Sequence, residues 1–578
     1  MKKIFGLITI GILFIFALSQ CNLEEFLDNP PKGVLTEANL TDPEDVEGFV
    51  IAAYSFPPKQ NAYYSMNPQW FGCVRSDDSY KGGGGGMGDQ VGWYQMEVFT
   101  LTGPNEVNYD RCWQGGYQAI RRCNLALQQL NKVSVDDFPM KEQRIAEVKF
   151  IRGFNYLMMK LFYRSIPYID ENLPSDQYET MKNHPDEMTD LDLWQKIADD
   201  FEDAYNVLPA TQPVDKARVT KWAAEAFLAK TLLFMAYEMN ATHQVININQ
   251  NRLEEALGHC NNIINNGPYE LCDNYGDMWT CESDYNNPEV IFAWNGTLQD
   301  GTTGSNLNRR MTLNTPTWPP YTTCCDFHKM SFSYINANRT GADGLPLFET
   351  FDNAELKNNP SYWTSNTFDP RLCHTTAIPG LPYCYNTSLL FDSAATVNPQ
   401  LNGYNHSMKE LVNPFSACQY QQRGNSKDDR LIRLSEVLLF KAEALIQLGR
   451  EDEALPVINE LRNRAANSAY RFADGTPCLD FNVQPYVDGV NCTWSNSYAW
   501  EALMWESRLE TAGEGRRFFD LVRWGTAADV MNAHFNKEKN RFEWMSAGFF
   551  TSGRDEFIPI PTNEISWSKG NLLQNPGY

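Results

Sequence analysis

The stretch RLSEVLLFKAEALIQLGREDEALPVINELRNRAA, residues 433–466, decides the fold. Apolar residues recur at helical spacing from Leu434 to Leu448 and stop at Gly449, a residue type that often closes helices. A second apolar stripe at the same spacing follows over residues 454–465. Because only a short polar turn separates the two stripes, they predict two antiparallel helices that pack against each other.

The same pair carries a repeat pattern. A Leu-Gly turn followed five residues later by a small residue, here Ala454, is typical of a tetratricopeptide repeat, since the small side chain lets the helices approach closely. Residues 227–238 and 253–264 form a degenerate second copy with a longer turn. An ordinary helical hairpin is the alternative for both pairs. Pro456 must lie near a helix start or leave one carbonyl unpaired.

Helical periodicity extends well beyond this pair, and further helices are predicted at about 113–130, 142–163, 190–207, 219–239 and 252–266. The middle of the chain differs, because it is rich in Asn, Thr, Pro and aromatic residues and has few periodic runs. A structureless loop of that length is uncommon in a compact domain. We therefore predict a mainly α fold, with a tetratricopeptide-like helical scaffold at about 40–266 and 431–578 and an inserted loop-rich, ligand-binding subdomain at about 268–430.

Charge and composition exclude several functional classes. The chain has 578 residues, with 48 Lys and Arg against 72 Asp and Glu, and a formal net charge of −24. A nucleic-acid-binding protein, or a peripheral binder of anionic lipids, would be basic. Aromatic residues make up 13% of the chain, which is more ring surface than a core needs. Some rings are therefore expected at the surface, where they could bind a ligand.

Residues 1–20 are predicted to be an export signal. Two lysines precede a largely apolar run from Ile4 to Leu18, which is too short for a membrane span. The sequence Leu18-Ser-Gln-Cys21 resembles the processing box of bacterial lipoproteins, which implies cleavage before Cys21 and lipidation of its thiol. Gln20 departs from the small residue usual there, and an ordinary secretory signal is the alternative. Export permits disulfides, and three pairs close in sequence are candidates: Cys272/Cys281, Cys373/Cys384 and Cys478/Cys492.

Seven motifs follow one another along the mature chain. They are Cys21 with Phe26-Leu-Asp-Asn-Pro30; Trp113-x3-Tyr117-x2-Ile120-x3-Asn124; Glu147-x-Lys-Phe-Ile-Arg-Gly-Phe-Asn-Tyr156; Arg433-Leu-Ser-Glu-Val-Leu-Leu-Phe-Lys-Ala-Glu-Ala444; Asn459-x2-Arg462-x-Arg464-Ala465; Glu506-x-Arg508-x-Glu510 with Glu514-Gly-Arg516 and Asp520-Leu-x-Arg523-Trp524; and Ile558-Pro-Ile-Pro561 with Gln574-Asn-Pro-Gly-Tyr578. Together they resemble the SusD/RagB family of Bacteroidetes outer-membrane nutrient-binding lipoproteins. The resemblance covers nearly all of residues 21–578.

The resemblance implies a mainly α fold with four tetratricopeptide-like units as its scaffold. It implies a protein held by its lipid anchor on the extracellular face of the outer membrane, where it caps a SusC-like TonB-dependent transporter barrel. The implied ligand is usually an oligosaccharide, and a peptide in one branch of the family. No enzymatic activity is implied.

The binding site is expected on loops, because ligand-binding residues concentrate on loops held by a rigid frame. Two segments, residues 70–105 and 316–321, mix planar rings with short polar groups. Rings can stack on the C–H face of a sugar while Asp and Asn bond its hydroxyl rim. The predicted ligand-binding residues are Trp70, Asp77, Tyr80, Trp93, Asn105, Trp318 and Tyr321. Packing within a buried loop explains each of these rings equally well.

Catalysis has little support in the sequence. The 7 His residues form no metal-binding spacing, and neither a metal nor a cofactor is predicted. Asp77 and Asp78 could be imagined as a glycosidase pair, but adjacent residues in extended chain point opposite ways. Arg433, Arg464 and the other charged residues of the motifs are expected to hold the scaffold together.

We therefore predict a non-catalytic surface lipoprotein that captures an oligosaccharide for a barrel transporter. Three alternatives stay open at this point. The same architecture could bind peptides, the protein could be a surface glycoside hydrolase, or the helical scaffold could serve only to dock a partner protein.

Overall fold

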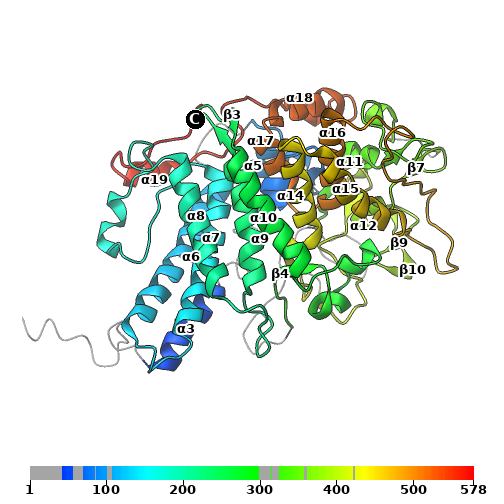
Figure 1. Cartoon of the computed structure of the whole chain (residues 1–578). Helices are drawn as coiled ribbons and strands as arrows, with labels where there is room; N and C mark the ends of the chain where they lie inside the picture. The colour runs from blue at the N-terminus through cyan, green and yellow to red at the C-terminus, as the bar shows by residue number, and fades with distance from the viewer. Residues whose placement is uncertain are drawn as a thin grey trace, which may run out of the picture.

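The structure, a computed structural model, describes residues 42–55, 69–84, 86–100, 107–298, 314, 325–356, 359, 361–420 and 424–578. Its α-helices are α3 (Pro43–Tyr54), α5 (Val91–Glu97), α6 (Val107–Lys132), α7 (Lys141–Tyr163), α8 (Asp190–Val207), α9 (Lys221–Ala236), α10 (Gln250–Asn266), α11 (Phe332–Ala337), α12 (Arg371–Thr375), α13 (Pro399–Asn402), α14 (Leu434–Gln447), α15 (Glu451–Ala466), α16 (Asn496–Thr511), α17 (Arg517–Arg523), α18 (Ala527–Glu538) and α19 (Thr562–Trp567). These helices make the fold mainly α, as predicted (Figure 1).

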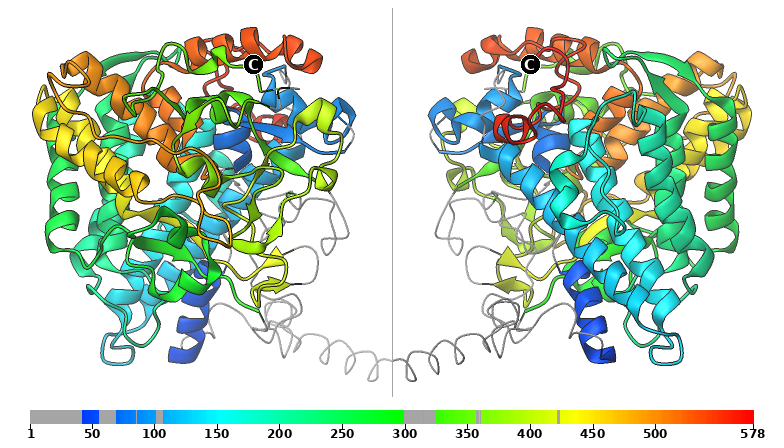
Figure 2. Two further views of the ribbon diagram at one scale, coloured as in Figure 1. Left: turned by 90° about the vertical axis from the view of Figure 1, so that its right-hand side faces the viewer. Right: turned by 90° about the vertical axis from the view of Figure 1, so that its left-hand side faces the viewer.

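The long helices form a continuous array in which each packs on the next. The array runs from α6 through α7, α8, α9 and α10 to α14, and α14 also contacts α15 and α16. Phe150 of α7 shows how the array holds together, because its ring meets those of Phe201, Phe227 and Phe292 at centroid distances of 5.5, 5.5 and 5.1 Å. Figure 2 shows α6, α7 and α19 at one end of the molecule and the loop-rich strands at the other.

The helical hairpin predicted from residues 433–466 is confirmed as α14 and α15. Gly449 closes α14 with a φ of +72°, a backbone angle that favours glycine. Ala454 is fully buried, as close helix packing requires. Pro456 lies inside α15, so the Asp452 carbonyl has no backbone N–H to accept four residues on.

The second predicted pair is confirmed as α9 and α10. Its longer turn contains strands β2 (Tyr237–Met239) and β3 (Val245–Ile248), which pair antiparallel. The predicted helix over 219–239 was too long at its end, because Tyr237 leaves α9 to pair with Ile248 of β3.

The middle of the chain is built from short strands. They are β4 (Val290–Trp294), β5 (Phe327–Met330), β6 (Arg339–Thr340), β7 (Thr367–Phe368), β8 (Thr376–Ala377), β9 (Pro382–Tyr383), β10 (Asn386–Leu390), β11 (His406–Ser407), β12 (Gln419–Tyr420), β13 (Gly424–Asn425) and β14 (Asp429–Arg433). A four-stranded antiparallel sheet has the order β1-β5-β11-β8, with β1 (Ser79–Gly82) coming from the amino-terminal part of the chain. Strand β14 pairs with β4 and leads directly into α14, which ties the irregular segment to the helices.

The predicted disulfides are wrong. Cys281 is bonded to Cys418, with a Cα–Cα distance of 6.5 Å, and Cys325 is disulfide-bonded as well. The remaining members of the predicted pairs, Cys272, Cys373, Cys384, Cys478 and Cys492, are free thiols. Closeness in sequence was a poor guide, because the fold brings residues 137 positions apart within bonding distance. Among the described residues, no helix combines the length and the apolar character needed to cross a bilayer.

Candidate functional site

Two segments of the chain, residues 56–68 and 299–324, are attached to the same part of the frame. They begin after Tyr54 of α3 and after Trp294 of β4, whose rings meet edge to face with centroids 6.4 Å apart. They end at η2 (Gln69–Val74) and just before β5, where Trp70 and Phe327 pack with centroids 5.9 Å apart. Trp70, the first residue of one predicted binding segment, packs at this part of the frame, and the other predicted segment, residues 316–321, falls within 299–324 in the sequence.

A buried aromatic cluster lies where these segments return. The rings of Trp70 and Trp93 lie 3.7 Å apart between centroids, and Trp93 also packs on Phe327 at 5.8 Å. Only 5% of Trp70 and 3% of Trp93 is exposed. Both were predicted to contact ligand, but each ring is covered by its neighbours. They support the surrounding loops and offer no exposed stacking surface.

Tyr80 and Asp77 are also interior residues, contrary to their predicted role at an exposed site. Tyr80 is fully buried, and its hydroxyl donates to Glu538 Oε2 at 2.7 Å and accepts from the Phe332 N–H at 2.9 Å. Asp77 is 3% exposed and accepts hydrogen bonds from Arg517. Their polar atoms are therefore bonded within the protein.

The adjacent carboxyl groups of Asp77 and Asp78 do not form a glycosidase pair. Asp77 lies 3.0 Å from Arg508 and 2.9 Å from Arg517, and Asp78 lies 2.8 Å from Arg508. Burial alone would raise the pKa of Asp77, but the two arginines hold it well below its usual range, whereas burial raises the pKa of Asp78. Because both groups are buried around one guanidinium, they cannot flank a sugar linkage.

Asn105, Trp318, Tyr321 and the lipidation candidate Cys21 lie outside the described residues. The roles given to them remain predictions.

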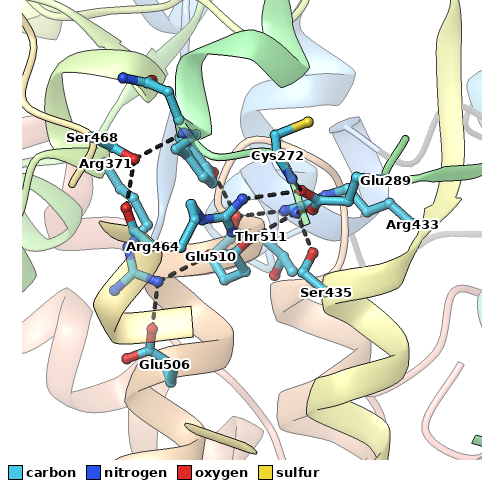
Figure 3. Close-up of polar contacts among 12 residues, drawn as sticks. Cys272, Glu289, Arg371, Arg433, Ser435, Arg464, Ser468, Glu506, Glu510 and Thr511 are labelled. Carbon is cyan, nitrogen blue, oxygen red and sulfur yellow. Dashed lines mark hydrogen bonds and ion pairs between the residues drawn. The ribbon is translucent and has the colours of Figure 1, made fainter. Parts of the chain in front are cut away.

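A buried ion-pair network fastens the irregular segment to the helices (Figure 3). Glu510 of α16 accepts from Arg433 at 2.7 Å, from Arg371 of α12 at 3.0 Å, and from Arg464 of α15. Glu289, just before β4, accepts from Arg433 at 2.7 Å and from Arg464 at 3.0 Å. All five side chains are nearly or completely buried. The scaffold role predicted for Arg433 and Arg464 is confirmed, while Arg371 and Glu289 were missed because they lie far away in the sequence.

A second buried polar cluster contains a cysteine, a histidine and a carboxylate. His328 Nδ1 lies 2.7 Å from Glu410 Oε1, and His328 also hydrogen-bonds the Cys73 thiol. Burial would lower the pKa of His328, but the Glu410 carboxylate raises it to about 10. The imidazole is therefore protonated at neutral pH and cannot act as a general base. Since Cys73 is 1% exposed, this cluster is structural.

A pocket of about 230 Å³ opens within the irregular segment, and we call it the η5 pocket after η5 (Tyr275–Trp279). Trp279, Tyr385 and Asn413 are among its lining residues. The Lys409 Nζ lies 4.5 Å from the Trp279 ring centroid, and the Trp279 indole N–H has no partner among the described residues. The Trp279 nitrogen itself is buried, so the structure does not present it to a ligand in the pocket. The sequence missed this pocket because its lining residues lie far apart in the chain.

One group among the described residues has metal-ligand spacing, namely Cys281, Glu282 and Cys418. Its two sulfur atoms are bonded to each other, so they cannot act as thiolate ligands.

Residues 288–578, half of the chain, match the model of the SusD family. The chain belongs to the SusD family. Residues 86–233 match a further model described as starch-binding and associating with the outer membrane. The resemblance drawn from the seven motifs is thereby confirmed.

Relatives of this SusD-family protein cover most of its length. It is 23% identical to SusD-like protein P25 of Formosa agariphila over 534 residues, 90% of each chain. A SusD-like protein from Bacteroides fragilis has the same fold with a TM-score of 0.69 and 19% identity, covering 95% of this chain and 100% of that one. A laminarin-binding SusD-like protein gives a TM-score of 0.66 at 20% identity, covering 93% and 100%.

Proposed function

We propose that this protein is a cell-surface lipoprotein that binds nutrient oligosaccharides and passes them, unaltered, to a SusC-like TonB-dependent transporter. Membership of the SusD family carries the proposal. It is supported by two structural neighbours, a laminarin-binding protein and surface glycan-binding protein A of Bacteroides thetaiotaomicron, the latter solved with laminarihexaose at a TM-score of 0.62 and 20% identity, covering 93% of this chain and 100% of that one. The family model that associates with the outer membrane supports the location.

We assign ligand contacts to Trp318 and Tyr321, which lie between β4 and β5 in the sequence, and to Asn105, which lies between α5 and α6. Pro319 and Pro320 stiffen the chain between Trp318 and Tyr321, which lowers the entropy cost of presenting both rings.

A binding screen tests the proposal. The protein from residue 22 onward is titrated with glucose hexasaccharides of β-1,3, β-1,4 and α-1,4 linkage and with a pool of basic peptides. We expect one or more of the glycans to bind and to be recovered uncleaved. Trp318→Ala should weaken that binding at least about tenfold, since aromatic anchors carry about 2 kcal/mol or more. Phe549→Ala, which removes a ring that is 63% exposed, is the matched control and should not weaken it.

The outcomes separate the alternatives. Binding of peptides without glycans would favour the peptide-binding alternative, and release of shorter sugars would establish a hydrolase. If neither ligand class binds, the proposal is wrong. For the anchor, radiolabelled palmitate should enter the full chain at Cys21 and be absent from Cys21→Ser, and the labelled protein should co-purify with a barrel transporter.

A further inference from the structure

A sizeable pocket lies away from the loop-rich segment. It has a volume of about 430 Å³, within the range of small-molecule sites. Its walls come from α6, from η4 (Ser175–Thr180) and from α19, so we call it the α6–α19 pocket. In Figure 1, α19 and strands β7, β9 and β10 lie at opposite ends of the molecule.

Four aromatic residues line this pocket: Trp113, Tyr117, Tyr178 and Trp567. The polar edges of two of the rings are fixed by the protein. The Tyr117 hydroxyl donates to the Pro167 carbonyl at 2.8 Å, and Trp113 hydrogen-bonds the Glu564 carboxylate. Their centroids lie 5.0 Å apart. Because these hydrogen bonds hold the rings in place, little side-chain freedom would be lost on binding.

Trp567 completes the aromatic lining from α19 and is 63% exposed. Tryptophan is highly buried on average, so an exposed indole beside a pocket is informative. It is the last residue of the six-residue helix α19, in which no residue is buried.

Polar groups on the α6 wall are free to bind a ligand. Gln114, Gln118 and Arg121 are exposed and share one face of α6, since they lie four and three residues apart. None of the three has a hydrogen-bond partner among the described residues. Arg121, Glu179 and Glu564 all line the pocket, so both signs of charge are present and neither a strongly anionic nor a strongly cationic ligand is favoured.

Planar rings beside uncharged amides suit a neutral ring with an apolar face and a hydroxyl edge. We propose that the α6–α19 pocket is a second glycan-binding site, which holds one or two neutral sugar rings stacked on Trp567 with their hydroxyls bonded by Gln114 and Gln118. The choice of ligand class rests on the proposed function. The position of the site does not, because it follows from the pocket itself.

Two sites on one protein predict a measurable stoichiometry. Whichever hexasaccharide of the β-1,3, β-1,4 and α-1,4 panel binds is counted by native mass spectrometry and calorimetry. Wild type should bind two molecules, and both Trp567→Ala and Gln118→Ala should bind one. Phe549→Ala, which removes an equally exposed ring elsewhere, should still bind two. For the parent polysaccharide, Trp567→Ala should lose about tenfold in affinity, because simultaneous binding at two sites is lost.

A second measurement locates the ligand. Saturating hexasaccharide should protect backbone amides of residues 113–124 and 564–572 from hydrogen exchange in wild type and not in Trp567→Ala. One bound molecule in wild type, or no effect of Trp567→Ala on either readout, would overturn the inference and leave the proposed function intact. Failure of wild type to bind any glycan in the panel would instead refute the proposed function and the second site with it.

Discussion

Replacing Glu510 by glutamine tests whether the buried ion pairs hold the irregular segment on the helices. The change keeps the shape of the side chain and removes its charge, while Arg371, Arg433 and Arg464 stay buried around it. Breaking a buried pair typically costs about 3–5 kcal/mol. Each arginine retains another carboxylate, and Arg464 keeps only Glu289. We therefore expect the free energy of unfolding to fall by about 3 kcal/mol, the lower end of that range.

That loss can be measured by heat and by denaturant. An unfolding entropy of about 2.1 cal/mol/K per residue over 578 residues corresponds to about 1.2 kcal/mol per degree, so Tm should fall by about 2–3 °C. The urea midpoint, followed by tryptophan fluorescence, should fall as well. Limited proteolysis should cut residues 267–430 faster, since that segment loses its attachment to α16.

The control is Glu453→Gln, which removes a carboxylate from an exposed ion pair with Arg450 and should leave Tm unchanged.

The pH dependence adds a further check. The arginines hold the pKa of Glu510 far below its usual range against the opposing effect of burial, so its charge stabilises the fold above the unfolded-state pKa, and this is lost as pH falls. The Tm values of wild type and Glu510→Gln should therefore become equal at acidic pH. If Glu510→Gln and Glu453→Gln have the same Tm at pH 7, the remaining carboxylates satisfy the arginines and the reasoning is wrong.

Three other changes probe single contacts by thermal melting. His328→Asn should lower Tm at pH 7. The difference in Tm from wild type should shrink as pH rises towards 10, because the stabilisation that comes from the raised pKa of His328 is lost through that range. A difference that stays constant would refute the charge assigned to His328. Gly72→Ala places a Cβ 2.1 Å from the Gly515 carbonyl oxygen and should prevent stable folding. Gly48→Ala, at an exposed position of α3, meets nothing within 4 Å and should be neutral or stabilise the fold by about 0.5–1 kcal/mol. Cys281→Ser with Cys418→Ser opens a loop of 137 residues and should cost about 5 kcal/mol, while Cys478→Ser with Cys492→Ser should cost far less because those thiols are free.

The sequence predicted the helical frame well because helices are encoded locally. The stripe from Leu434 to Leu448 and the turn at Gly449 lie within a few residues of one another, so periodicity suffices. Disulfides and strand pairing in the middle of the chain depend on residues brought together from far apart. The pairing of Cys281 with Cys418, like that of β1 with β5, has no local signal.

The same reasoning explains why the candidate site was predicted less well than the fold. Trp70, Tyr80 and Trp93 have the composition expected of a sugar-binding loop, but composition does not show which side of a loop faces solvent. In contrast, Trp113 and Tyr117 line the α6–α19 pocket from within a motif that we had used only to recognise the family. Their i, i+4 spacing placed both rings on one face of a helix, and that was the available signal.

The buried ion pairs fix the positions of the elements to which residues 299–324 are attached. A change in these ion pairs is therefore expected to affect both stability and binding. Arginines at 371, 433 and 464 come from three elements and meet on carboxylates from two others, so the relative positions of β4, α12 and α14–α16 are fixed by directional hydrogen bonds as well as by packing. An apolar core of equal volume would tolerate sliding of these elements more readily. Residues 299–324 leave from β4 and return to β5, so a shift of β4 would move one end of the segment that carries Trp318 and Tyr321. Glu510→Gln should accordingly weaken glycan binding at the loops more than at the α6–α19 pocket, whose walls make no contact with this network.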